Sequence, residues 1–354
     1  ERWELREDGA TFWLREDARW SNGKPVTAHD FVFAWRKVVD PANASEYAFI
    51  LYPITNAQAI NEGELPLSEL GVRAVDDHTL EVDLFQPCPY FLGLTAFGVL
   101  NPVNQEFYES RGERYAADVE DLLYNGPFKL TSWIHGASLR MDKNPEYWDR
   151  DNVWLETIDA PYITEDSNAR LNLYRDGMIA MANGMNEQAL LGAMQERMQI
   201  KTFMDGAIFF IEFNQRDERA TRSKYLRKAI QTVLNTEDLV YKVIGNPGSF
   251  PARTIFPRWM KGVDDDFVRE FPPERVPVDL DLGRKYIELA KQELGVEQLP
   301  PITLLADDSQ GGSKVSEYLQ AVMKQRLGLD VRVDAQIFKQ RLAKMTSGDF
   351  DMVI

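Results

Sequence analysis

Apolar and polar positions near the start of the chain follow a pattern that predicts a strand, a tight turn and a helix in immediate succession. Phe12 and Leu14 fall on one face of the predicted strand. Residues 21–23, Ser-Asn-Gly, tolerate the positive φ angles of a turn. Thr27 is placed to cap a helix in which apolar residues recur at helical spacing until Pro41. The opening of the chain therefore predicts a well-defined structural module.

Changes in this pattern divide the chain into lobes. The first part alternates short strand patterns with turn signals and prolines, which predicts a small mixed lobe. The pattern changes at the turn sequence Asn-Gly-Pro of residues 125–127 and again after Asp205. We predict a small mixed α/β lobe at 1–124, part of a central hinge-side lobe at 125–205, and part of a second ligand-binding α/β lobe at 206–354.

Helices and strands alternate in the last of these segments. Residues 207–211, Ala-Ile-Phe-Phe-Ile, predict a strand that is covered on both faces. Two helical patterns end at Gly295 and Gly328, since glycine suits the C-terminal cap of a helix. A short apolar strand pattern follows each helix. This β-α-β order predicts an α/β architecture.

The two ends of the chain resemble the interior of a protein. The first residues lie within a strand-like segment, and residues 350–354, Phe-Asp-Met-Val-Ile, predict a buried strand. We therefore expect a fragment that is incomplete at both termini.

Composition narrows the classes of partner. The chain has 56 acidic and 40 basic residues, and its formal net charge of −16 disfavours nucleic acid and anionic membrane surfaces as partners. Cys88 is the single cysteine, so an internal disulfide is impossible and a buried, inert thiol is expected. No apolar run approaches the length of a membrane span.

A search for catalytic and metal-binding motifs favours no enzyme class. The three histidines lie far apart in sequence and outside the usual metal-ligand spacings. The chain contains neither a nucleophile elbow nor a phosphate-binding glycine loop. Counting carboxylates does not exclude a glycosidase-like pair, but residues 264–266, Asp-Asp-Asp, lie in a polar run that should be solvated. We predict no catalytic residue, no metal and no cofactor.

Several motifs, in this order, together resemble a known family. The block at 12–37, FWLREDARWSNGKPVTAHDFVFAWRK, is the most informative of them. The others are VRAVDDHTLEV at 72–82, PYF at 89–91, NGPFKL at 125–130, NPEYWD at 144–149, NLYRDG at 172–177 and LRKAI at 226–230. The chain resembles the extracytoplasmic solute-binding proteins of family 5, which serve peptide transporters of the ABC type, and most of all the periplasmic oligopeptide-binding proteins.

The resemblance implies a type II periplasmic-binding-protein-like fold, with two or three lobes around a hinged ligand cleft. It implies a non-catalytic, monomeric receptor of an ABC importer that captures oligopeptides by lobe closure and delivers them to the membrane permease. The location would be the periplasm, or the cell exterior with a lipid anchor in a Gram-positive source. Other solutes remain open within the family: a murein peptide, a dipeptide, glutathione or a chelated metal. An acidic secreted hydrolase and an interaction module without a competent cleft are the alternatives from other classes.

The resemblance also implies six ligand-binding residues, for each of which an ordinary core or surface role is the alternative. Because neighbours on a strand alternate, two of them, Phe210 and Glu212, are predicted to share one face. The six positions are Tyr47, Phe210, Glu212, Asp307, Ser309 and Phe338.

The chain also departs from the family pattern. It has Gly312 where some peptide-binding relatives carry a histidine, and Ile244 where they carry a lysine. Both changes remove groups that could hold a ligand carboxylate, so selectivity for ligand length is expected to differ. The acid that relatives pair with the peptide α-amino group would lie beyond Ile354.

Overall fold

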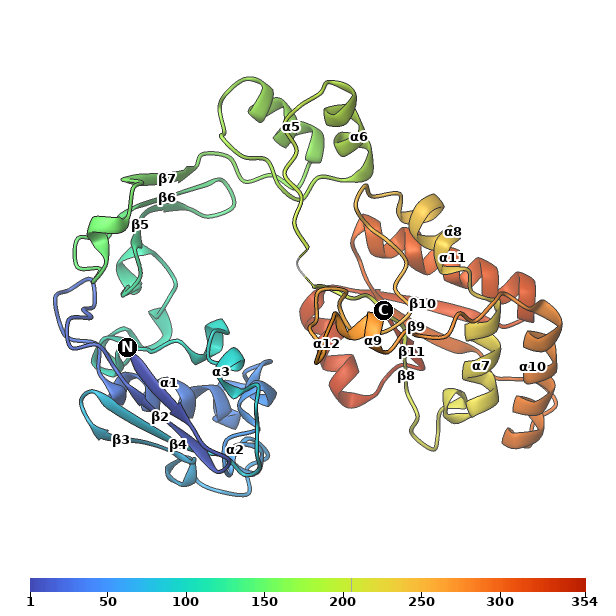
Figure 1. Ribbon diagram of the computed structural model, residues 1–354, viewed down its shortest axis with the longest axis horizontal. Helices are drawn as coiled ribbons and strands as arrows, with labels where there is room; N and C mark the ends of the chain where they lie inside the picture. Colours follow the sequence, from blue (N-terminus) through green and yellow to red (C-terminus); the bar gives the residue numbers. More distant parts are fainter. Residues whose placement is uncertain (205) are drawn as a thin grey trace. The chain divides into compact units, whose positions relative to one another are not determined.

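The computed structural model describes residues 1–204 and 206–354. The chain folds as two compact units, Glu1–Glu165 and Asp166–Ile354 (Figure 1). Asp205, where the sequence pattern places a lobe boundary, lies outside the described residues.

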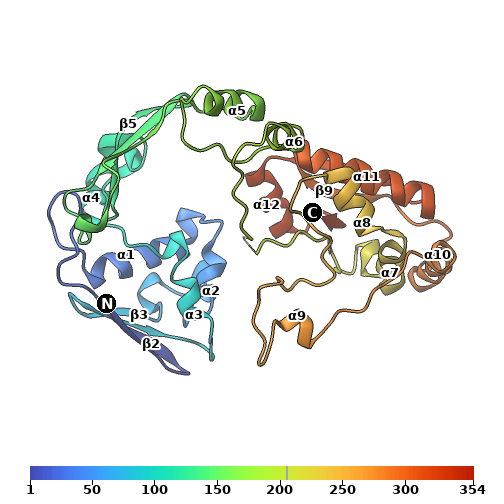
Figure 2. The same cartoon turned by 45° about the horizontal axis from the view of Figure 1, so that its top comes forward.

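The first unit is built on an antiparallel sheet in the order β1-β2-β4-β3. Helix α1 (Ala28–Val39) packs against this sheet (Figure 2). The predicted strand and helix are confirmed as β2 and α1, and the backbone N–H of Thr27 donates to Oδ2 of Asp30 at 2.9 Å, as at a capped helix start. The strands are β1 (Arg2–Leu5), β2 (Gly9–Trp13), β3 (Val72–Asp76) and β4 (Thr79–Asp83).

The core of this unit lies between α1 and the sheet. Trp35 of α1 is buried there, and its Nε1–H donates to the carbonyl of Leu100 at 2.9 Å. Cys88 is buried in the same core, as the sequence predicted. Short helices complete the layer: η1 (Pro41–Asn43), η2 (Ala48–Leu51), α2 (Ala57–Asn61), η3 (Leu67–Glu69), α3 (Phe91–Leu94), η4 (Gly98–Leu100), α4 (Gln105–Arg111), η5 (Gly112–Arg114) and η6 (Val119–Asp121).

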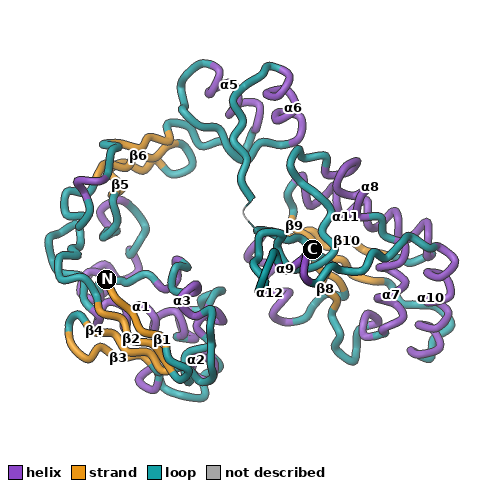
Figure 3. Tube along the Cα trace, viewed as in Figure 1, coloured by secondary structure: helices purple, strands orange, loops and turns teal. Residues whose placement is uncertain are grey.

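A second antiparallel sheet of three strands follows in the first unit, in the order β5-β6-β7. Its elements are β5 (Phe128–Ile134), β6 (Ser138–Lys143), η7 (Arg150–Asn152) and β7 (Thr157–Ala160). Figure 3 shows these strands and the loops that join them.

The second unit contains a sheet in the order β10-β9-β11-β8, in which β9, β10 and β11 are parallel and β8 is antiparallel to β11. The predicted β-α-β rhythm is confirmed in the order β9, α11, β10, α12, β11. The helices α10 and α11 end at Gly295 and Gly328 with positive φ angles, as expected. The strands are β8 (Glu212–Phe213), β9 (Ile302–Asp307), β10 (Val331–Gln336) and β11 (Met352–Val353).

Helices cover both faces of this sheet. Leu304 of β9 packs in one cluster with residues of α7, α10 and α11, whereas Leu305 packs in another with Met345 of α12. Neighbouring strand residues point to opposite faces, so α11 and α12 lie on opposite sides. The helices of this unit are α5 (Ser167–Arg175), α6 (Glu187–Gln195), η8 (Ala220–Arg222), α7 (Lys224–Val233), α8 (Thr236–Asp238), the π-helix η9 (Leu239–Ile244), α9 (Phe267–Glu270), α10 (Leu280–Leu294), α11 (Gln310–Leu327) and α12 (Phe338–Ser347).

The prediction of a covered strand at 207–211 is wrong. Strand β8 begins only at Glu212, and the side chain of Phe209 is 91% exposed. The described pairing of β8 with β11 joins Phe213 to Met352 and Glu212 to Val353, and it does not include residues 207–211. An apolar run predicts burial, but it does not supply the partner strand that burial requires.

Candidate functional site

The carboxyl ends of β9 and β10 form the most informative edge of the second unit. Asp307, the last residue of β9, is level with Gln336, the last residue of β10. The chain leaves these neighbouring strands towards helices on opposite faces, α11 and α12. In open α/β sheets, ligands bind at such a switch point, outside the carboxyl ends of the strands.

The loop after β9 is held in place by its own polar groups. The backbone N–H of Ser309 donates to Oδ1 of Asp307 at 2.9 Å. The Ser309 hydroxyl accepts from the backbone N–H of Gly312 at 3.0 Å and thereby caps α11. Two of the predicted ligand-binding residues therefore lie side by side at the switch point.

Gly312 is a glycine for a steric reason. A Cβ atom there would lie 2.6 Å from Cγ of Asp307 and 2.7 Å from the Asp307 carbonyl oxygen. A larger side chain at this position would require the loop after β9 to move.

The loop after β10 adds an aromatic side chain and a cation to this edge. Phe338, the first residue of α12, is 52% exposed. Arg341 follows one turn later, with Nη1 4.0 Å from Oδ2 of Asp307. The carboxyl end of β9 and the first turn of α12 thus approach each other, since Asp307 ends β9 and Arg341 lies in α12.

The third contribution to this edge comes from β8. Glu212 is level with Val353, which is level with Leu305 of β9. Because β8 is antiparallel to β11, the residues before Glu212 run towards the carboxyl edge of the parallel strands. Phe210, which is 55% exposed, therefore lies towards the same edge as Asp307. The shared face of Phe210 and Glu212 stays a prediction, because β8 begins only at Glu212.

Tyr47, the sixth predicted residue, belongs to the first unit. It precedes η2 and is half-buried. Its ring centroid lies 5.5 Å from that of Phe97 and 6.2 Å from that of Phe49, and both phenylalanines are exposed. The tyrosine is thus part of an exposed aromatic cluster.

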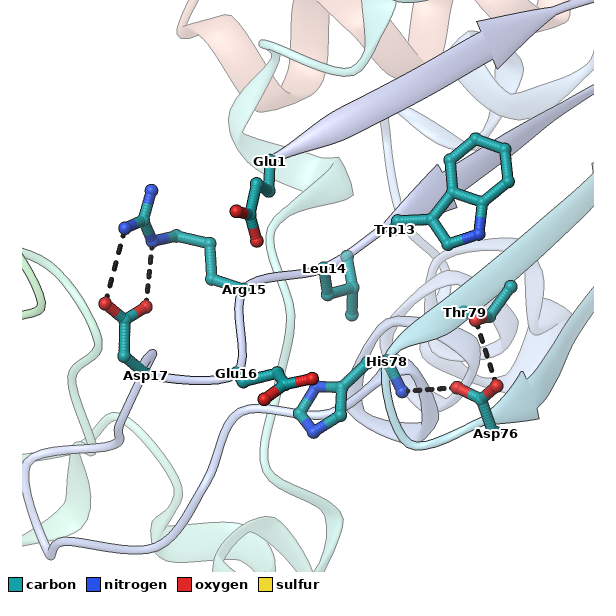
Figure 4. A pocket seen from close by; sticks show the side chains of 9 residues that line it. All are labelled: Glu1, Trp13, Leu14, Arg15, Glu16, Asp17, Asp76, His78 and Thr79. Carbon is teal, nitrogen blue, oxygen red and sulfur yellow. Dashed lines mark hydrogen bonds and ion pairs between the residues drawn. The ribbon is translucent and has the colours of Figure 1, made fainter.

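A separate cavity of about 670 Å³ opens in the first unit beside β2 and β4 (Figure 4). Two of its acidic groups, Asp76 and Asp17, already have partners. Oδ1 of Asp76 accepts from the backbone N–H of His78 at 2.8 Å, and Arg15 donates to Asp17 at 3.0 Å. The His78 N–H lowers the pKa of Asp76, and the Arg15 guanidinium lowers the pKa of Asp17. Both carboxylates are therefore ionised at neutral pH and unsuited to general acid chemistry.

The described residues offer no metal centre, since no group of three His, Cys, Asp or Glu side chains among them could hold an ion. Among these same residues, no helix combines the length and apolarity needed to cross a bilayer.

Comparison with known proteins decides the family. The family described as "Bacterial extracellular solute-binding proteins, family 5 Middle" matches residues 1–354. The chain belongs to this family. Its members are solute-binding proteins found outside the cytoplasm, in agreement with the resemblance seen in the sequence.

Among curated members of family 5, the chain is 32% identical to the oligopeptide-binding protein OppA of Bacillus subtilis over 99% of its own length. It is 29% identical to the periplasmic oligopeptide-binding protein OppA of Salmonella typhimurium, again over 99% of its length. The chain spans 64% of the length of each of these two relatives.

Solved structures of family 5 share the fold. The substrate-binding domain of an oligopeptide ABC transporter from Bacillus anthracis matches with a TM-score of 0.81 at 36% identity, over 99% of this chain and 68% of that one. Listeria monocytogenes OppA bound to peptide matches with a TM-score of 0.79 at 32% identity, over 100% and 70% of the two chains. The predicted periplasmic-binding-protein-like α/β fold is confirmed.

Sequence reasoning missed two features of these surfaces. It did not single out Arg341, which a helix pattern alone shows only as one more exposed cation. It also did not group Tyr47 with Phe97, since the two lie fifty residues apart in the sequence. Only the tertiary fold brings Arg341 close to Asp307 and Tyr47 close to Phe97.

Proposed function

We propose that this protein is the substrate-binding receptor of an ABC importer, which captures oligopeptides by lobe closure and delivers them to the membrane permease. The observation that carries the proposal is the match of family 5 to residues 1–354. Relatives at about 30% identity are named as oligopeptide-binding proteins, and one similar structure is a complex with peptide.

The carboxyl edge of the second unit suits a peptide ligand. Phe210 and Phe338 offer exposed aromatic surface, and Asp307 and Ser309 offer polar atoms beside it. A receptor that pairs with peptide backbone groups and leaves side chains in roomy pockets tolerates many sequences. We propose Tyr47, Phe210, Glu212, Asp307, Ser309 and Phe338 as ligand-binding residues.

The rest of the proposal concerns how the receptor works. Ligand contacts that are better in the closed than in the open arrangement suffice to drive closure. We propose lobes at 1–124, 125–205 and 206–354, a monomeric and non-catalytic protein, and the ABC permease subunits as its partner. Its location would be the periplasm, or the cell exterior with a lipid anchor in a Gram-positive source.

The test is a thermal-shift titration of the complete mature protein with free and N-acetylated peptides of two to six residues. A ligand that binds the native state raises the apparent melting temperature by mass action. We expect free peptides to raise it, and mass spectrometry should recover them intact. If no peptide raises the melting temperature, the oligopeptide assignment is refuted and the other solutes of the family should be screened. Recovery of cleaved peptides would instead favour a hydrolase.

A further inference from the structure

Methionines are concentrated in the segment that contains α5 and α6. Six of the eleven methionines of the chain lie in this segment: Met178, Met181, Met185, Met194, Met198 and Met204. Met185 and Met198 are half-buried and pack against one small apolar cluster. The side chains of the other four are exposed. Two thioethers therefore belong to a core, and several similar thioethers nearby face solvent.

The cluster that Met185 and Met198 contact joins α5 to α6. Among the described residues, its buried side chains are Leu171 of α5 and Ala189 and Ala193 of α6. The two alanines bury little apolar area because their side chains are single methyl groups. The long thioether side chains therefore supply much of the apolar contact between the two helices.

Met198 also closes the C-terminal end of α6. Its backbone N–H donates to the carbonyl of Ala193 at 3.0 Å, and the N–H of Arg197 donates to the carbonyl of Met194 at 3.0 Å. This is the Schellman motif, in which an apolar residue beyond the helix packs on its last turn. Arg197 has a φ angle of 57°, in the left-handed region that favours glycine. The packing of Met198 helps to offset the cost of this conformation.

The start of α6 is fixed against elements of the candidate site. Oε2 of Glu187, the first residue of α6, lies 3.5 Å from Nζ of Lys314 in α11. The Glu187 carboxylate also fills the space that a Cβ atom at Gly245, the C-terminal cap of η9, would need. Helix α11 begins at the loop after β9, where Ser309 caps it. A displacement of α6 would therefore change the contacts of α11 beside this loop.

Oxidation of a thioether would change the character of this cluster. A lone pair on sulfur attacks one oxygen of hydrogen peroxide, so that an S–O bond forms and the O–O bond breaks. The sulfur gives up two electrons, and the departing hydroxide takes the proton from the transferred oxygen and leaves as water. The product is a polar sulfoxide, which must turn towards water or find a hydrogen-bond donor. Either change withdraws the side chain from the contact between α5 and α6.

We propose that Met185 and Met198 form a reversible oxidation site, at which hydrogen peroxide produces sulfoxides that loosen α6 and weaken peptide binding. The weakening of peptide binding rests on the proposed function, whereas the oxidation and the loosening of α6 do not. Members of family 5 are extracellular, so an oxidant outside the cytoplasm reaches them directly. Reduction of the sulfoxides by methionine sulfoxide reductases would restore the cluster.

The experiment treats the complete mature protein with hydrogen peroxide and locates the sulfoxides by mass spectrometry. Joint replacement Met185→Leu and Met198→Leu preserves the volume of the cluster but removes both thioethers. Joint replacement Met185→Gln and Met198→Gln introduces polar groups there without an oxidant. Met178→Leu with Met181→Leu is the matched control, because both of these side chains are exposed.

Hydrogen exchange of the α6 amides and peptide affinity are the two quantities measured. In the unchanged protein and in the matched control, we expect peroxide to accelerate this exchange at least about tenfold. Peptide binding should weaken at least about fivefold, as for coupling between two sites. The double leucine variant should show neither change. The double glutamine variant should show both changes before oxidation, and methionine sulfoxide reductases should reverse them in the unchanged protein.

Three outcomes would overturn the assignment. In the first, peroxide oxidises Met178 and Met181 but leaves Met185 and Met198 unmodified. In the second, Met185 and Met198 are oxidised, but amide exchange in α6 or peptide affinity stays the same. In the third, the double leucine variant responds to peroxide as the unchanged protein does.

Failure of the proposed function would be recognised separately. If the unoxidised protein binds no peptide, the receptor assignment fails and the claimed effect on peptide binding fails with it. Hydrogen exchange needs no ligand, so it still decides whether oxidation of Met185 and Met198 loosens α6.

Discussion

Replacement of Gly312 by alanine tests the packing of the loop after β9. Gly312 and its neighbour Gly311 both lie in the first turn of α11, so alanine should favour the helix at either position. At Gly311, the nearest atom to a new Cβ is the Ser309 hydroxyl, 3.7 Å away, which is ordinary contact. At Gly312, a new Cβ would lie only 2.7 Å from the carbonyl oxygen of Asp307.

The two substitutions should therefore have opposite effects on stability. Relief of the glycine entropy is worth roughly 0.4–1 kcal/mol where the new side chain fits, so Gly311→Ala should raise the free energy of unfolding by about that amount. Overpacking costs roughly 1–3 kcal/mol, since a backbone carbonyl cannot rotate away as a flexible side chain can. After the same helix gain is subtracted, Gly312→Ala should lower the free energy of unfolding by up to about 2.6 kcal/mol.

Differential scanning calorimetry of the two variants and the unchanged protein measures this difference. For a unit of this size, each kcal/mol moves the melting temperature by about 2–4 °C. We expect the Gly312→Ala transition to lie below that of the unchanged protein and the Gly311→Ala transition above it. Equal stabilisation by both substitutions would refute the steric argument and would show that the loop after β9 yields readily.

Two further predictions concern buried polar groups. Asn214→Ala should lower the free energy of unfolding by about 1–3 kcal/mol, because Nδ2 donates to the carbonyls of Gly348 at 3.0 Å and Phe350 at 2.9 Å; a loss below about 0.5 kcal/mol in urea unfolding, as at exposed sites, would contradict this. Burial raises the pKa of Asp30 above its ordinary value of 3.8, so its contribution to stability is complete below that pH and is lost as the pH rises through the folded-state pKa. The unfolding free energy of Asp30→Asn should therefore rise, relative to that of the unchanged protein, from acid to neutral pH. If the difference between the two unfolding free energies does not change with pH, burial does not perturb the pKa of this carboxyl.

Local sequence was sufficient for much of the secondary structure. The helix after Thr27 and the glycine stops at Gly295 and Gly328 depend on interactions within a few residues, and all three were predicted correctly. The strand at 207–211 failed because pairing is a property of two segments, and β11 lies more than a hundred residues away. Hydrophobicity identifies a segment that could pair, but it does not identify the residues with which that segment pairs.

In the candidate site, too, local sequence predicts local contacts but not contacts between distant segments. Asp307 and Ser309 were proposed from the family resemblance, and the hydrogen bond between them is local. The neighbouring position of Arg341 depends on the crossover that returns the chain beside β9 on the opposite face of the sheet.

The pairing of β8 with β11 also bears on when this unit can fold during synthesis. Nδ2 of Asn214 is bonded to the carbonyl of Phe350, 136 residues later. At ribosomal rates of about 5–20 residues per second, roughly 7 to 27 s separate the appearance of these two groups. Throughout that interval Phe209 and Phe210 lie beside a strand that has no partner, so the nascent chain is exposed to aggregation or is free to engage a chaperone. The contacts between β8 and β11 therefore form long after β8 has been synthesised.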